Sequence, residues 1–218
     1  MEAKLKEILS RFDLGKTIKL TEEEELVILK YLMYHDEYPV GNGSSRVVYA
    51  LDDYVVKVAM STGGLNQHAV ERDFYERYSK AGCFAHLFAY GKTINVMEFL
   101  AECDFYDYLD EGWYDDEDKE KYEAISAAIA TADEVTDYDG GDNCQVGYSI
   151  MQNAWVLYDY GYSLDYERND LVDDVGSWMD VVDPIENAIR MMETGEVFDY
   201  GELSRMVDDF YAEEEEEN

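Results

Sequence analysis

The sequence predicts an α+β protein, and three observations lead to that class. Apolar side chains recur at helical spacing in residues 1–38, alternate with a period of two in residues 45–59, and show helical spacing again in residues 66–78 and after residue 180. Short polar turns between successive strands are typical of antiparallel sheets. The chain has 218 residues, of which 47% are apolar, so it can form one compact core or two small lobes.

Composition limits the partners. The chain has 51 acidic and 17 basic residues and a formal net charge of −34. Such a surface repels nucleic acids and anionic membranes and attracts basic-surfaced proteins. The cysteines are odd in number and widely spaced, which favours neither a disulfide framework nor a zinc site. No apolar leader follows Met1 and no apolar stretch is long enough to span a membrane, so we expect a cytoplasmic protein.

Two helices are predicted in residues 1–38, as a helical extension. The first ends at Gly15, and the second begins at Thr21, which forms a capping box with Glu24. The first has the apolar residues Leu5, Ile8, Leu9 and Phe12, and the second has Leu26, Leu29, Leu32 and Met33. These stripes indicate that both helices pack against a core.

A β-hairpin is predicted next, with strands at residues 47–51 and 54–59 joined by Asp52 and Asp53. Lys57 lies between valines in the second strand. Its stem can be buried, but its ammonium then needs an anion. The alternative is an edge-strand lysine that reaches solvent.

A helix is predicted at residues 66–78, where Val70, Phe74 and Tyr78 recur every four residues. Glu71 lies beside this stripe. It can pair with Lys57, or it can belong to an ordinary solvated face. Two further strands are predicted at residues 84–90 and 93–100, joined by Gly91 and Lys92.

Residues 41–100 resemble the small lobe of the protein-kinase-like superfamily. The resemblance rests on the glycine-bearing segment 41–48, on Lys57 and Glu71, and on residues 97–100, which are similar to the hinge that binds adenine. It implies that Lys57 anchors the phosphates of ATP and that Glu71 pairs with Lys57. It also implies a set of nucleotide-binding positions, which are Gly41, Gly43, Ser44 and Ser45 in the loop and Glu98 and Leu100 in the hinge.

Two positions depart from the family pattern. Arg46 stands where a third glycine is usual, which stiffens the loop, and Val55 replaces a smaller residue, which narrows the adenine pocket.

The catalytic loop departs further, because its segment, residues 135–143, contains no histidine. Asp137 or Asp139 is the candidate that orients the acceptor hydroxyl, and Asn143 is a candidate Mg²⁺ ligand. A plain turn rich in glycine and aspartate explains the segment equally well. After it, a hairpin at residues 146–158 leads to Asp159, whose place before Tyr160 and Gly161 is similar to the metal-binding aspartate of kinases.

The second half of the chain is predicted to be mainly helical. Residues 101–120 are acidic with interleaved aromatic residues, and residues 119–133 are predicted to form a buried helix. A helix is expected to start at Asp183 and Pro184 and end at Gly195, and a last helix is expected at residues 202–211.

The predicted organisation is therefore a two-lobed, kinase-like fold. Its parts are the extension at 1–38, an antiparallel-sheet N-lobe at 39–100, a reduced, mainly helical C-lobe at 101–212 and an acidic tail at 213–218. The resemblance covers residues 41–161, and compact acidic chains of this type resemble proteins of phages and mobile elements.

The leading hypothesis is a kinase-like protein that binds ATP and Mg²⁺, either a minimal phosphotransferase or a pseudokinase. The alternative is an acidic interaction protein on a kinase-like scaffold, which inhibits a basic-surfaced partner such as a nuclease or defence factor, or mimics DNA. The two differ in where acids lie: an enzyme keeps them away from the phosphate site, whereas a mimic lines one continuous face with them.

Overall fold

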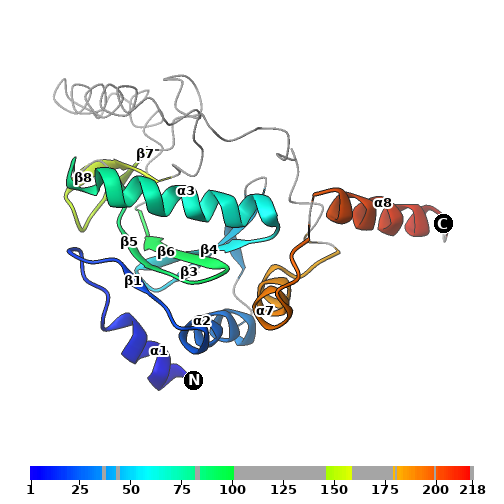
Figure 1. Cartoon of the computed structure of the whole chain (residues 1–218), viewed down its shortest axis with the longest axis horizontal. Coiled ribbons are helices and arrows are strands. Elements are labelled where there is room, and N and C mark those ends of the chain that lie inside the picture. The colour runs from blue at the N-terminus through cyan, green and yellow to red at the C-terminus, as the bar shows by residue number, and fades with distance from the viewer. Residues whose placement is uncertain are drawn as a thin grey trace. The chain divides into compact units, whose positions relative to one another are not determined.

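The computed structural model describes residues 1–35, 38–42, 45–81, 84–100, 146–158, 179, 181–198 and 200–216. These residues form an α+β protein with a mixed six-stranded sheet of order β1-β5-β6-β4-β3-β2 and a separate hairpin, β7-β8 (Figure 1). The strands are β1 (Ile18–Lys19), β2 (Pro39–Asn42), β3 (Arg46–Leu51), β4 (Tyr54–Ala59), β5 (Leu87–Tyr90), β6 (Ile94–Glu98), β7 (Val146–Ser149) and β8 (Ala154–Leu157). The helices are α1 (Glu2–Leu9), α2 (Glu22–Tyr34), α3 (Thr62–Tyr78), α7 (Pro184–Thr194) and α8 (Tyr200–Glu216), with a 3₁₀ turn at Ser79–Ala81.

The chain divides into two compact units. The first contains residues 1–68, 87–97 and 168–218, and so includes the six-stranded sheet except for Glu98, the last residue of β6. The second contains residues 69–86 and 98–167, and includes the β7-β8 hairpin.

The predicted β3-β4 hairpin is confirmed. Its strands pair antiparallel from Arg46 and Ala59 to Leu51 and Tyr54. Asp52 at the turn has a φ of 52°, a left-handed conformation that aspartate tolerates better than most residues. This register fixes which side chains share a face of the sheet.

One face of the sheet forms the apolar core of the first unit. Alternate residues of β3 and β4 point into it, and α2 and α7 lie side by side against it (Figure 1). The buried side chains come from β3 (Val47, Tyr49, Leu51), β4 (Val56, Val58), β6 (Ile94, Val96), α2 (Ile28, Leu29, Leu32) and α7 (Ile185, Ala188, Met191). Helices α2 and α7 therefore cover this face of the sheet, and the remaining side chains of the strands project from the opposite face.

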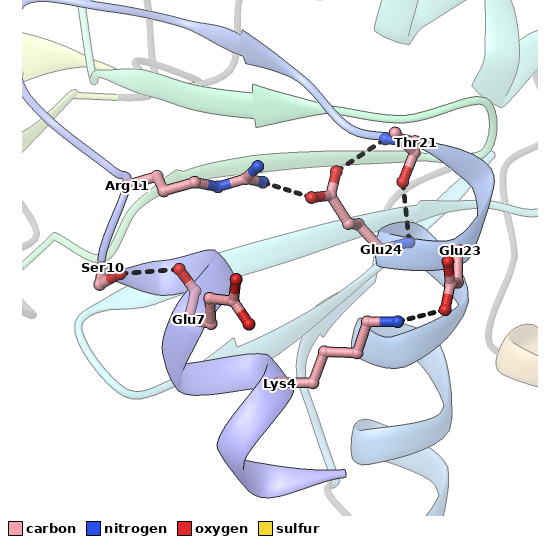
Figure 2. Close-up of polar contacts among 7 residues, drawn as sticks. All are labelled: Lys4, Glu7, Ser10, Arg11, Thr21, Glu23 and Glu24. Carbon is pink, nitrogen blue, oxygen red and sulfur yellow. Dashed lines mark hydrogen bonds and ion pairs between the residues drawn. The ribbon is translucent and has the colours of Figure 1, made fainter.

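Helices α1 and α2 are joined by polar contacts at the surface (Figure 2). The predicted capping box is confirmed: the Thr21 side chain accepts from the Glu24 N–H, and Glu24 accepts from the Thr21 N–H. Arg11 pairs with Glu24 at 2.8 Å, and Lys4 pairs with Glu23. The hydrogen bond from the Thr21 backbone, aided by the charge of Arg11, lowers the pKa of Glu24 below its ordinary value.

The first predicted helix ends earlier than expected, at Leu9 instead of near Gly15. Phe12 follows the helix, and its ring packs against Tyr54 and Phe88, with centroids 5.1 and 5.8 Å apart. The position of Phe12 in the apolar pattern therefore reflects the packing of its ring and does not extend the helix. In α2 the buried stripe includes Ile28 in addition to the predicted Leu29 and Leu32.

A buried carboxylate holds the turn between β5 and β6. Glu25 of α2 accepts hydrogen bonds from the Lys92 N–H at 2.7 Å, and from the Thr93 N–H and hydroxyl at 2.6 and 2.7 Å. A Cβ at Gly91 would collide with this carboxyl group, so a larger residue there would have to displace Glu25 from its hydrogen bonds. The Lys92 ammonium donates to the carbonyls of Met191 and Met192, near the C-terminal end of α7.

The C-terminal helices agree with the sequence in part. Helix α7 begins after Asp183, whose side chain accepts from the Ile185 and Glu186 N–H groups, and it ends at Gly195 with a φ of 75°, as predicted. Helix α8 runs to Glu216, beyond the predicted end at Tyr211 and into the expected acidic tail.

Other element bounds also differ from the prediction. Helix α3 begins at Thr62, four residues before its expected start, because Gly63 and Gly64 are helical instead of forming a loop. Strand β6 ends at Glu98. Strand β1, which pairs in parallel with β5, was not predicted, because two residues carry no periodicity. The β7-β8 hairpin in the second unit was predicted and is confirmed. No helix in the described part of the chain is long and apolar enough to cross a membrane.

Candidate functional site

The candidate site lies on the second face of the sheet in the first unit. In the β3-β4 register Arg46 lies opposite Ala59 and Lys57 lies opposite Val48. Both cationic side chains therefore project from the face of the sheet opposite the apolar core. Each residue is only 5% exposed. Burying a cation is costly unless an anion or hydrogen-bond acceptors compensate, and both residues do take part in polar or electrostatic interactions.

The start of α3 lies close to this face. The Ser45 hydroxyl donates to Gln67 at 2.7 Å, and the Ser45 carbonyl accepts from the Met60 N–H at 2.9 Å. A Cβ at Gly64 would collide with the Ser45 carbonyl and crowd Ala59, so only glycine allows this close approach. The backbone just before Arg46 is therefore held by β4 on one side and by α3 on the other.

A third polar residue is buried on the same face. Asn95 of β6 is fully buried, and its side-chain amide donates to the carbonyl of His68 in α3 at 3.3 Å. The neighbouring residues Ile94 and Val96 point to the apolar core instead. The two faces of the sheet thus differ sharply in polarity, although both are covered.

Acidic residues avoid the sheet. Its strands contain three basic residues, Lys19, Arg46 and Lys57, and one acidic residue, Glu98 at the end of β6. The strands themselves therefore carry more basic than acidic side chains, in a chain whose formal net charge is −34.

The Glu98 side chain belongs to a buried polar cluster in the second unit. Its carboxylate accepts from the Ser149 hydroxyl and from the Gln152 amide at 3.0 Å, and it lies 3.3 Å from the His86 N–H. Gln152 also donates to the Phe84 carbonyl at 3.0 Å. This cluster ties the β7-β8 hairpin to residues 84–86 and to the end of β6.

Helix α3 contributes two further residues with polar interactions to the second unit, Tyr75 and Glu71. The Tyr75 hydroxyl is hydrogen-bonded to Nδ1 of His86. Glu71, in the middle of α3, is 0% exposed and takes part in a polar or electrostatic interaction. Its burial argues against the alternative that Glu71 belongs to an ordinary solvated face.

The structure assigns local roles to several predicted nucleotide-binding residues. Gly41 pairs with Val48 inside β2 and not in a free loop. The Ser45 hydroxyl is bonded to Gln67. The Glu98 N–H donates to the His86 carbonyl at 2.9 Å, so a ligand that uses this N–H must displace that bond. Leu100 lies over β7, because a Cβ at Gly147 would be 2.7 Å from its Cδ1.

The remaining predicted site residues lie outside the described residues. They are Gly43, Ser44, Asp137, Asp139, Asn143 and Asp159. The segments predicted as an acidic stretch and a buried helix, residues 101–133, also lie there. Among the described residues no group of three or more histidine, cysteine, aspartate or glutamate side chains is arranged to hold a metal ion.

Sequence reasoning treated Arg46 only as a departure from a glycine pattern. The period of two in the hairpin contained the signal that Arg46 and Lys57 share a face, because the turn at Asp52 and Asp53 fixes the register. Ser149 and Gln152 carried no such signal, since their partner Glu98 lies about fifty residues away in sequence.

Comparison with known proteins adds no assignment: no protein-family model matches the chain, and no curated protein matches it.

Proposed function

We propose that this protein binds a nucleotide through a kinase-like small lobe and acts as a minimal phosphotransferase or a pseudokinase. The observation that carries the proposal is the placement of Lys57. Lys57 is buried in β4, which is the third strand when β2 is counted as the first. Helix α3, which contains the buried acid Glu71, follows β4 in the chain. Kinases place the phosphate-anchoring lysine on their third strand and its glutamate partner on the next helix.

The charge distribution supports the same proposal. An enzyme that binds phosphates must keep acids away from them, and β2, β3 and β4 contain none. The cations Arg46 and Lys57, which share one face of the sheet, are of the kind that binds the phosphate groups of a nucleotide. A DNA mimic would instead present acids with regular spacing on one face, which these strands do not do.

In this proposal Lys57 binds the α- and β-phosphates and is oriented by Glu71. The backbone at residues 98–100 contacts adenine, and Asp159 and Asn143 hold Mg²⁺, which neutralises charge on the phosphates when it is bound. Asp137 or Asp139 orients the acceptor hydroxyl. The roles of these four residues stay predictions from the sequence.

The test is a calorimetric titration of the full chain with ATP, with and without Mg²⁺. We expect a Kd in the micromolar to millimolar range, or roughly 4–8 kcal/mol of binding free energy. Lys57→Met should weaken binding at least about tenfold, because it removes a charge-assisted contact. Lys19→Met is the matched control, since Lys19 is an exposed lysine in a strand of the same sheet, and it should bind ATP as the wild type does.

Activity is tested separately with Asp159→Asn. If phosphoryl transfer occurs, this change should abolish Mg²⁺-dependent turnover and leave the fold intact. We expect transfer to be weak or absent, because the catalytic loop has no histidine before the aspartate.

Absence of any nucleotide binding at millimolar concentration would favour the acidic interaction protein instead. In that case Lys57→Met should keep full biological effect, and charge reversal of the acids in residues 104–118 should abolish it.

A further inference from the structure

We propose that Arg46 is a second phosphate-binding residue, and that Arg46 and Lys57 together select a ligand that carries a polyphosphate group. This inference rests on the proposed function, because it assigns a ligand group to the same face of the same sheet. The chemical class that fits is a nucleoside triphosphate, and the part recognised is its triphosphate chain.

The register places the two cations near each other. Lys57 and Ala59 are two residues apart on β4, and Ala59 is the cross-strand partner of Arg46. Both side chains therefore leave the same face at diagonal positions, within reach of one extended anion. A guanidinium binds phosphate oxygens in a bidentate manner, whereas an ammonium acts as a point charge, so the two can contact successive phosphate groups.

The backbone at Arg46 is positioned rigidly for this role. It directly follows Ser45, whose carbonyl is bonded to Met60 and whose hydroxyl is bonded to Gln67. The tight approach of Gly64 holds the same point from the side of α3. A side chain that starts from a fixed backbone loses less entropy when it binds a ligand.

The composition of the strands also fits a multiply charged ligand. The strands β2, β3 and β4 contribute two cations and no acid. A triphosphate carries several negative charges and can interact with both cations at once.

Calorimetric titrations of the full chain with ATP, adenosine and inorganic tripolyphosphate test the inference. Arg46→Gln should weaken ATP and tripolyphosphate binding about ten- to a hundredfold, as loss of a charge-assisted hydrogen-bonding group does, and should leave adenosine binding unchanged. Arg46→Lys should have an intermediate affinity. Arg11→Gln is the matched control: it removes the same charge from an arginine that pairs with Glu24, and all three ligands should bind as before (Figure 2).

Equal losses for adenosine and ATP would show that Arg46 only supports the structure, and would overturn the inference. Unchanged ATP binding in Arg46→Gln would overturn it while leaving the proposed function intact. If the wild type binds tripolyphosphate in an Arg46-dependent way but neither ATP nor adenosine, the role of Arg46 in polyphosphate binding stands, whereas the nucleoside triphosphate as ligand and the nucleotide function both fail. If it binds none of the three, both fail. Should Arg46→Gln not fold by circular dichroism, equal tripolyphosphate affinity of wild type and Arg46→Lys would overturn the inference.

Discussion

The two faces of the six-stranded sheet are both covered, yet they are built from different residues. One face meets α2 and α7 with valine, leucine and isoleucine side chains. The other carries Arg46, Lys57 and Asn95, all buried, beside the first turns of α3. Burial on the first face stabilises the fold through removal of apolar surface from water, whereas burial on the second requires compensation of charge and hydrogen bonds.

This difference indicates where function can reside. Removal of apolar surface from water accounts for the first face, whereas the cations of the second face are buried together with interaction partners. The comparison also has one instructive exception, because Glu25 brings a carboxylate to the core side. Three hydrogen bonds from the turn at residues 92–93 compensate the burial of this carboxylate, so its role is structural.

The largest stability effect is expected on the apolar face. Leu29→Ala removes a fully buried side chain of α2 and should lower the free energy of unfolding by about 2–5 kcal/mol, from lost burial and the resulting cavity. Urea unfolding measures it. Leu14→Ala, at a side chain that is 44% exposed, is the control and should change little. A loss below about 1 kcal/mol for Leu29→Ala would mean that this face does not form the core.

Glu25→Ala should have the next largest effect. It leaves buried donors of Lys92 and Thr93 without their acceptor, and should lower the free energy of unfolding by about 1–3 kcal/mol. Glu25→Gln, which keeps one acceptor oxygen, should lose less. Glu23→Ala is the surface control, with a side chain that is 78% exposed, and should lose under about 1 kcal/mol. Equal losses of unfolding free energy for the Glu25 and Glu23 variants would show that the hydrogen bonds of Glu25 do not stabilise the turn.

A double-mutant cycle probes the polar face. If Lys57 pairs with Glu71, as the resemblance implies, Lys57→Met and Glu71→Leu should each destabilise the protein, and the double variant should recover part of the loss. The expected coupling is about 0.5–3 kcal/mol in chemical unfolding. The cycle of Lys19→Met with Glu71→Leu should show none. Strict additivity of Lys57 and Glu71 would rule out the pair.

The smallest effect at neutral pH is expected for Tyr49→Phe, which tests how strictly the apolar face excludes charge. Burial, with a smaller contribution from the charge of Asp183, raises the pKa of Tyr49 above its ordinary value. The unfolded chain therefore releases this proton first, near pH 10, and stability should fall as pH rises above that point. Tyr49→Phe should show a shallower alkaline loss in thermal unfolding, whereas Tyr38→Phe, at an exposed tyrosine, should follow the wild type. Identical alkaline slopes for wild type and Tyr49→Phe would contradict the assignment.

Local signals determined much of this fold in advance. The capping box at Thr21 and Glu24, the turn at Asp52 and Asp53, and the stop of α7 at Gly195 are each specified by residues within a few positions of one another. Such elements follow from the sequence because their hydrogen bonds and backbone conformations are set by near neighbours.

Contacts between distant segments were decided only by the tertiary structure. Two residues of β1 become a strand because β5 offers a parallel edge, and Phe12 leaves the helix because Tyr54 and Phe88 bury its ring. The predicted site shows the same division. The sequence identified Lys57 and its strand, and the period of two placed Arg46 on the same face, but only packing showed that Ser45 and Glu98 already have partners. The physical reason is that a periodic pattern specifies which side of an element is buried, whereas the partners buried against it come from parts of the chain that the pattern does not contain.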